Sequence, residues 1–178
     1  MQAWMLSILT GVLGLLFGNI LGMLRERHAQ SLTARLELLK PVERWLDLAN
    51  RIIHIIADDV QSLSQNQPFS VGYSIQERVN VGKEISETTP KVLAILQTKS
   101  LRTIGTWRSS DQLSGSIRQL NSYLQSVLLP VDDELTAKGA TWSKIDNEIQ
   151  RVSNALALVQ PLLNQTFASL AKMKVTLV

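Results

Sequence analysis

The 22 residues from Ala3 to Leu24, AWMLSILTGVLGLLFGNILGML, contain no charged side chain. A helix of this length rises about 33 Å, at about 1.5 Å per residue, and the hydrocarbon core of a bilayer is about 30 Å thick. Arg25 follows directly and ends the uncharged run. The stretch therefore predicts a single transmembrane helix over residues 1–24, followed by a helical domain over residues 25–178.

Small residues recur every three or four positions within this stretch. At about 100° per residue, the four glycines, Ser7 and Arg25 fall within about 80° of arc. Small residues at such spacing let two helix backbones approach closely in a membrane. Asn19 lies beside this stripe, and an amide in lipid needs a hydrogen-bonding partner. We expect the helices to self-associate through this face. The expected contact residues are Ser7, Gly11, Gly14, Gly18, Gly22 and Asn19.

Basic residues occur only after the apolar stretch, beginning with Arg25 and Arg27. The positive-inside rule then places the N-terminus outside and the rest of the chain in the cytoplasm. No Lys or Arg precedes the stretch and no A-x-A-like site follows it, so we interpret it as a retained anchor rather than a signal peptide. We expect the protein in the bacterial inner (plasma) membrane, with a cytoplasmic C-terminal domain.

The charge balance argues against nucleic acid as a specific partner. The net charge of +3 arises from 18 basic and 15 acidic residues, which are spread along the chain without a basic arm. Proteins that bind DNA or RNA usually concentrate their basic residues on one face or segment. The chain also has no cysteine, which excludes disulfides and thiolate chemistry. We therefore expect no sequence-specific nucleic acid partner.

Four later segments carry apolar residues at the three-and-four spacing of amphipathic helices. They run over residues 25–65, 70–99, 111–138 and 142–170. In the second of them the pattern predicts Val79 and Ile85 in the core. Ser109, Ser110 and Asp111 resemble a helix start. No convincing strand pattern appears, so the fold class is all-α, with an antiparallel four-helix bundle after the transmembrane helix.

Each of these four segments contains a proline near its middle. A proline inside a helix removes one hydrogen bond and clashes with the preceding turn, at a cost of about 3 kcal/mol unless the helix bends. We expect a kink or break at each position, and a true break at Pro90, where Thr89 can act as an N-cap. The prolines are Pro41, Pro90, Pro130 and Pro161. Such kinks have two alternative consequences. Either the helices curve and wrap the core, or the kinks splay the bundle and open a face for a partner.

The residues that could carry chemistry do not form a recognisable catalytic or metal-binding motif. His28 suits the headgroup layer, whereas His54 and Asp58 share a helix face but have no third ligand at a metal-binding spacing. The acidic run 132–134 follows Pro130, where carboxylates complement a helix dipole. Phosphate-binding loops, nucleophile elbows and zinc-protease motifs are absent from the sequence. We expect no enzyme activity, no catalytic residues, no cofactor and no metal site.

One polar stretch is a candidate surface for an anion or an acidic partner. Between the second and third segments, cationic groups and an indole occur close together, and such groups can clamp a phosphate or stack on a flat ring. The residues are Lys99, Arg102, Trp107 and Arg108. A solvated loop is the alternative interpretation.

Two functional hypotheses fit these features. In the first, the glycine face drives a homo-oligomer, and a ring of such helices encloses a hydrophobic constriction that forms a pore gated by dewetting. In overall plan the chain resembles small membrane effectors of bacterial antiviral defence systems, which implies a soluble activating protein as a further partner. In the second hypothesis, the chain is a non-catalytic scaffold or accessory subunit of a larger membrane complex. A membrane-anchored enzyme is a weaker third interpretation.

Overall fold

The computed structural model describes the backbone of residues 2–65, 71–103, 105–129 and 142–177. Side chains are described for residues 18–62, 64–65, 76–103, 105–129 and 146–177. Every regular element in these ranges is a helix, and none is a strand. The chain divides into two compact units, Met1–Glu37 and Leu38–Val178. The hydropathy pattern of the sequence instead predicts a boundary between Leu24 and Arg25.

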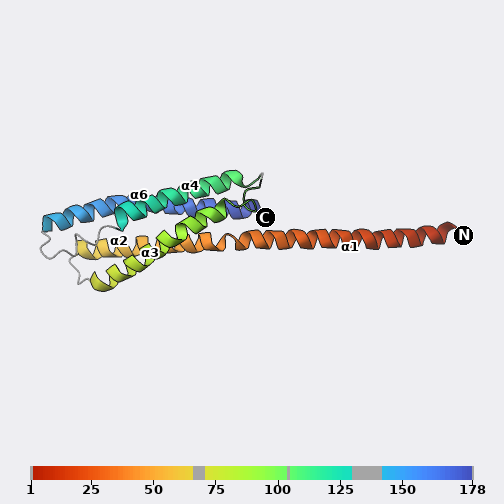
Figure 1. Ribbon diagram of the computed structural model, residues 1–178, viewed down its shortest axis with the longest axis horizontal. Coiled ribbons are helices and arrows are strands. Elements are labelled where there is room, and N and C mark those ends of the chain that lie inside the picture. Colours follow the sequence, from red (N-terminus) through yellow and green to blue (C-terminus); the bar gives the residue numbers. More distant parts are fainter. Residues whose placement is uncertain (1, 66–70, 104, 130–141, 178) are drawn as a thin grey trace. The chain divides into compact units, whose positions relative to one another are not determined.

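The first unit is one helix, α1 (Gln2–Glu37), drawn without interruption in Figure 1. The apolar stretch and the following Arg25, Glu26 and Arg27 lie in this same helix. No glycine or proline occurs between Met23 and Glu37, so no residue there disfavours continuation of the helix. Within the described residues, no helix combines the length and the hydropathy that a membrane crossing requires.

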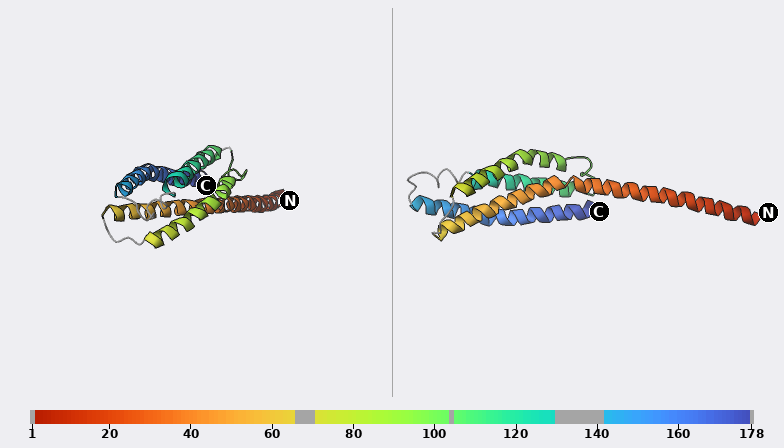
Figure 2. Two further views of the ribbon diagram at one scale, coloured as in Figure 1. Left: turned by 60° about the vertical axis from the view of Figure 1, so that its left-hand side comes forward. Right: turned by 90° about the horizontal axis from the view of Figure 1, so that it is seen from below.

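The second unit is a helical bundle of α2 (Lys40–Ser64), α3 (Val71–Leu96), α4 (Trp107–Tyr123) and α6 (Trp142–Leu177). Helix α2 packs against α3 and α6, and α4 packs against the same two helices. Each helix runs opposite to its neighbour in sequence, as Figures 1 and 2 show. The predicted all-α bundle is thus confirmed.

The core of the bundle follows the predicted apolar spacing in most places. The fully buried side chains include Leu46, Ile53 and Ile56 of α2, and Ile117 and Leu120 of α4. Helix α6 contributes the fully buried side chains of Leu163 and Met173 to the same core. Burial of one such side chain contributes about 1.5–3 kcal/mol, so these contacts supply most of the stability of the bundle.

The prediction for Val79 was wrong. This side chain is 54% exposed, whereas Val81 and Ile85 are buried. The buried face of α3 runs instead through Arg78, which is only 3% exposed. A charged residue therefore occupies a core position, and the apolar pattern alone could not identify that face.

The four prolines behave differently from one another. The predicted break near Pro41 is confirmed, since α1 ends at Glu37 and Pro41 lies in the first turn of α2, where its missing N–H has no cost. The predicted break at Pro90 was wrong, because α3 continues through it. Helix α6 likewise continues through Pro161. Pro130 lies outside the described residues.

A π-helical turn, η1 (Leu124–Leu128), follows α4 directly. The N–H of Leu129 donates to the carbonyl of Leu124 at 2.9 Å, five residues back instead of four. The next residue in the sequence is Pro130, which has no N–H to donate and whose ring disfavours a regular α-helical turn before it. The π-helical turn thus occurs directly before a proline, where a regular α-helical turn is disfavoured.

The start of α4 was also predicted wrongly. The N-cap residue is Thr106 and not one of Ser109–Asp111. Ser110 lies fully buried inside the helix, where its hydroxyl donates to the carbonyl of Leu96 at the end of α3. A serine that the sequence presents as a helix start therefore joins two helices of the bundle.

Two glycines of the bundle give a test of its packing. A Cβ added at Gly115 in α4 would meet no atom within 4 Å, whereas one at Gly82 in α3 would lie 2.9 Å from a methyl of Leu129. We expect Gly115→Ala to raise the free energy of unfolding by about 0.8–1 kcal/mol, because glycine is that much worse than alanine in a helix. Gly82→Ala is expected to raise the free energy of unfolding by less, because the Leu129 side chain must move to accommodate the new methyl group. Urea denaturation of both variants measures the difference, and equal gains would contradict the close contact.

Candidate functional site

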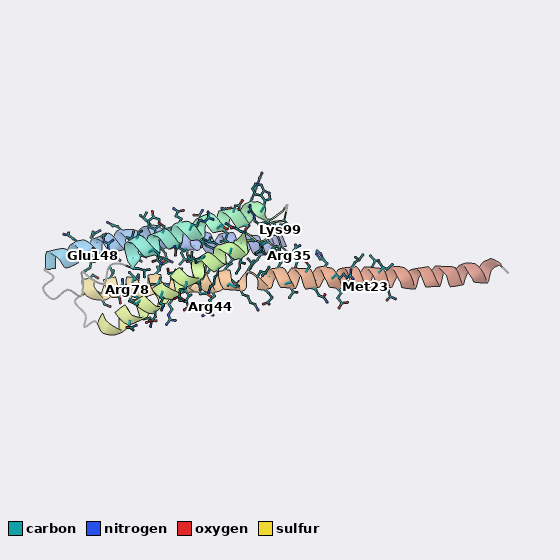
Figure 3. The ribbon with its side chains drawn as sticks, in the orientation of Figure 1. Met23, Arg35, Arg44, Arg78, Lys99 and Glu148 are labelled. Atoms are coloured by element: carbon teal, nitrogen blue, oxygen red, sulfur yellow. The ribbon has the colours of Figure 1, made fainter. Side chains whose placement is uncertain are left out.

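The described part of α1 exposes apolar side chains that have no covering layer. Every residue from Gly18 to Ser31 is exposed. Figure 3 labels Met23 on this helix. More than half of the surface of each of these side chains is accessible: Ile20, Leu21, Met23 and Leu24. At about 1.5–3 kcal/mol for each side chain fully buried, this surface has a strong tendency to leave water.

Ile20, Met23 and Leu24 lie about 120° or more from the centre of the glycine stripe, whereas Leu21 lies beside the stripe. A Cβ at Gly18 or Gly22 would meet nothing within 4 Å, so this side is open. Asn19 is exposed beside it. The side chains of residues 2–17 are outside the described part, so the expected contacts at Ser7, Gly11 and Gly14 are not tested. The described helix is compatible with the predicted self-association face but does not show a partner on it.

The second predicted surface lies on the turn between α3 and α4. Thr106 holds this turn, because its hydroxyl accepts the Thr103 N–H at 3.1 Å and donates to the carbonyl of Leu101. The Thr103 hydroxyl, 2.9 Å away, must then donate to Thr106. Leu101 is fully buried and fixes the turn to the core. The cationic residues around it are thus carried by a well-bonded backbone.

All four residues of this predicted surface are exposed, but two contacts within the protein already engage three of them. Arg102 lies 3.2 Å from the carboxylate of Asp111. The Arg108 guanidinium lies 5.2 Å from the ring centroid of Trp107, a cation–π contact. Lys99 follows the end of α3 (Figure 3). The arrangement is an accessible cationic and aromatic surface rather than an enclosed anion site.

The structure also contains a buried ion pair that sequence reasoning missed. Arg78 of α3 lies 3.5 Å from the Asp59 carboxylate of α2 and donates to the carbonyl of Leu128 in η1 at 3.1 Å. Figure 3 labels Arg78 on α3. The Arg78 side chain is 4% exposed and that of Asp59 is 11% exposed. This contact ties three elements together around the π-helical turn.

A buried polar contact joins α2, α3 and α4 near Pro90. The indole N–H of Trp45 donates to the hydroxyl of Thr89 at 2.8 Å, and that hydroxyl lies 2.6 Å from the carbonyl of Ile85 and 3.2 Å from the amide of Asn121. The single hydroxyl proton goes to the short contact with Ile85. Thr89 therefore acts inside a continuous helix, not as the N-cap that the sequence predicted.

This contact gives a matched test with the neighbouring threonine. We expect Thr89→Val to lower the free energy of unfolding by about 1–3 kcal/mol, because it leaves the buried Trp45 N–H without an acceptor. The control is Thr88→Val, since the Thr88 hydroxyl bonds only to carbonyls of its own helix. Thermal or urea unfolding measures both, and equal losses would show that the indole contact is not important.

Several grooves border α3. One, of about 440 Å³, is lined by Trp45 and Leu48 and by charged residues that include Lys40, Lys91 and Glu84. Another, of about 400 Å³, lies beside Gly82 and includes Gln125 of η1 in its lining. Both grooves are open and are formed by residues distant in sequence, so sequence spacing gave no indication of them.

Metal chemistry has no support among the described residues. No group of three or more His, Cys, Asp or Glu side chains in that part of the chain lies close enough to hold an ion. His54 and Asp58 are exposed on α2, and His28 is exposed on α1. The acidic run 132–134 lies outside the described residues.

Comparison of the chain with protein-family models, with curated proteins and with solved structures gives no match.

Proposed function

We propose that the chain is a single-pass membrane protein that works by self-assembly through α1. One observation carries this proposal: α1 is a 36-residue helix whose apolar side chains between Ile20 and Leu24 lie exposed, while the bundle buries its own. A helix with apolar residues on most of its surface is stable when lipid or protein surrounds it. The 22 uncharged residues from Ala3 to Leu24 supply the length for a bilayer.

The glycine stripe supports assembly in addition to anchoring. Lipid tails are as apolar as leucine, so helices associate in membranes mainly through close packing, which small residues permit. Gly18 and Gly22 have open space beside them in the described helix. A ring of α1 helices would enclose a narrow apolar pore, and the bundle would carry the surface that receives an activating soluble protein. This arrangement corresponds to an effector that alters the permeability of a bacterial inner membrane.

The bundle contributes positioning and recognition in this proposal. Its exposed turn with Trp107 and Arg108 offers an indole and a guanidinium to a partner. The basic residues after Leu24 support a cytoplasmic location of the bundle in this proposal, by the positive-inside rule.

Two measurements on the full chain test this function. The protein is expected to remain in membranes washed with alkaline carbonate, and purified protein reconstituted into liposomes is expected to release a trapped ion. Release into the carbonate wash would contradict the membrane anchor. Retention with no ion release, with or without a cell lysate added as a source of activator, would contradict the pore and favour a scaffold or accessory subunit.

A further inference from the structure

The stripe on α1 does not end where the apolar stretch ends. At about 100° per residue, Ala29, Leu32 and Leu36 fall within the same arc of about 80° as Gly18 and Gly22. Ala29 is exposed, and Leu32 and Leu36 are half-buried. All of these residues belong to one uninterrupted helix. Beyond Arg25, which lies within the same arc, apolar residues thus occupy the stripe again for about two turns.

The stripe has a period of eleven residues. Ser7, Gly18 and Ala29 are eleven apart, and so are Gly14, Arg25 and Leu36. An eleven-residue repeat corresponds to about 3.67 residues per turn, which gives a right-handed supercoil. Glycine-mediated helix pairs in membranes also cross with a right hand. The residues outside the apolar stretch and the glycines within it therefore favour the same geometry.

The charges beside the stripe show which kind of helix fits it. Glu26 and Glu37 lie on one flank of the stripe and Arg35 lies on the other, whereas Arg25 lies within the stripe itself. When two copies of this helix pair in the same direction, opposite flanks meet, so acidic residues of one copy face basic residues of the next. An antiparallel pair would place like flanks together, and like charges at helix contacts are unfavourable.

Polar groups next to the stripe do not oppose this contact. The Thr33 hydroxyl donates to the carbonyl of Ala29 at 3.0 Å within the helix. The Gln30 amide lies 3.5 Å from the Glu26 carboxylate, also within the helix. The Thr33 hydroxyl therefore already donates a hydrogen bond within its own helix. Packing a second helix against this face would not leave that hydroxyl buried without an acceptor.

We propose that residues 29–36 of α1 form a parallel, right-handed contact with the same residues of a second copy of this chain. This inference rests on the proposed self-assembly and extends it beyond the bilayer. The contact sets the rotation of each α1 about its axis, because Ala29, Leu32 and Leu36 must face the neighbouring copy.

Single-cysteine cross-linking tests this contact directly, since the chain has no native cysteine. The test variants are Ala29→Cys and Leu36→Cys, and Ala34→Cys is a matched control on the opposite side of the helix. Each full-length variant is oxidised in native membranes, and the disulfide-linked dimer is measured. We expect at least about five-fold more dimer at 29 and 36 than at 34, because a disulfide needs Cα atoms about 4.4–6.8 Å apart.

The pattern of cross-linking distinguishes a parallel contact from an antiparallel one and from random collision. Linkage at 29 and 36 together requires a parallel pair, whereas linkage at only one of them overturns the parallel arrangement. Equal linkage at 34 indicates random collision and overturns the contact. The mass of the same variants before oxidation separates the two proposals: an oligomer without linkage at 29 and 36 refutes this inference alone, and a monomer refutes self-assembly as well.

Discussion

Replacing Arg78 with alanine is expected to lower the free energy of unfolding of the bundle by about 3–5 kcal/mol. The substitution leaves the Asp59 carboxylate buried without its cation and removes the bond to the Leu128 carbonyl at the π-helical turn. Domains are stable by only about 5–15 kcal/mol, so this loss is a large part of the total. Urea denaturation followed by far-ultraviolet circular dichroism measures the loss.

The control for this prediction is an ion pair at the surface. Arg51→Ala removes a hydrogen bond of 3.0 Å to Glu77, but the Arg51 side chain is 60% exposed. Exposed pairs contribute about 0–1 kcal/mol. Replacing both members of the buried pair, as in Arg78→Met with Asp59→Leu, is expected to cost less than Arg78→Ala, because no charge remains buried. Equal losses for the Arg51 and Arg78 variants would contradict the importance of the buried pair.

The double substitution Gly14→Leu with Gly18→Leu is expected to convert the oligomer to monomers. Two leucines on the stripe would separate the helix backbones, and close packing is the main attraction between helices in lipid. The bundle should stay folded, since both positions lie in α1 and outside the second unit. Blue native electrophoresis of the detergent-solubilised protein measures the change in assembly, and circular dichroism checks that the helix content is kept.

The matched control changes the opposite side of α1. Leu9→Ala with Leu16→Ala alters two side chains about 160–180° from the stripe and should leave the oligomer intact. An oligomer that survives the glycine substitutions, or one that the leucine substitutions dissolve equally well, would show that another face makes the contact.

Sequence reasoning predicted the helical class and much of the core for a physical reason. Apolar residues at three-and-four spacing must share a face, and Ile117 and Leu120 are buried as that spacing requires. The pattern failed where polar groups occupy the core. Arg78 and Thr89 are buried because Asp59, Leu128 and Trp45 satisfy them, and these partners are distant in sequence.

Helix boundaries were harder to predict than helix faces. The first segment after the apolar stretch was predicted as one helix over residues 25–65, but the chain turns at Leu38 and Leu39, and Leu39 is fully buried. Pro41 indicated this break correctly, whereas Pro90 and Pro161 lie within continuous helices. A proline in the first turn of a helix has no cost, but tertiary contacts such as that of Trp45 with Thr89 decide whether a helix continues through an interior one.

Of the candidate site residues, those on the α3–α4 turn were placed correctly on an exposed surface, but their mutual contacts were not predicted. The cation–π contact of Trp107 with Arg108 and the ion pair of Arg102 with Asp111 depend on where α4 starts, and that start was misplaced by the serine pattern. The glycine stripe, by contrast, follows from helical spacing alone and needed no tertiary information.

The native mass of the full-length protein, solubilised from membranes and corrected for bound detergent and lipid, tests the central claim most directly. Self-assembly through α1 predicts a single defined mass that is an integer multiple, of two or more, of the 19.8 kDa chain. A monomeric mass, or quantitative recovery of the chain in the aqueous fraction before any detergent is added, would contradict it.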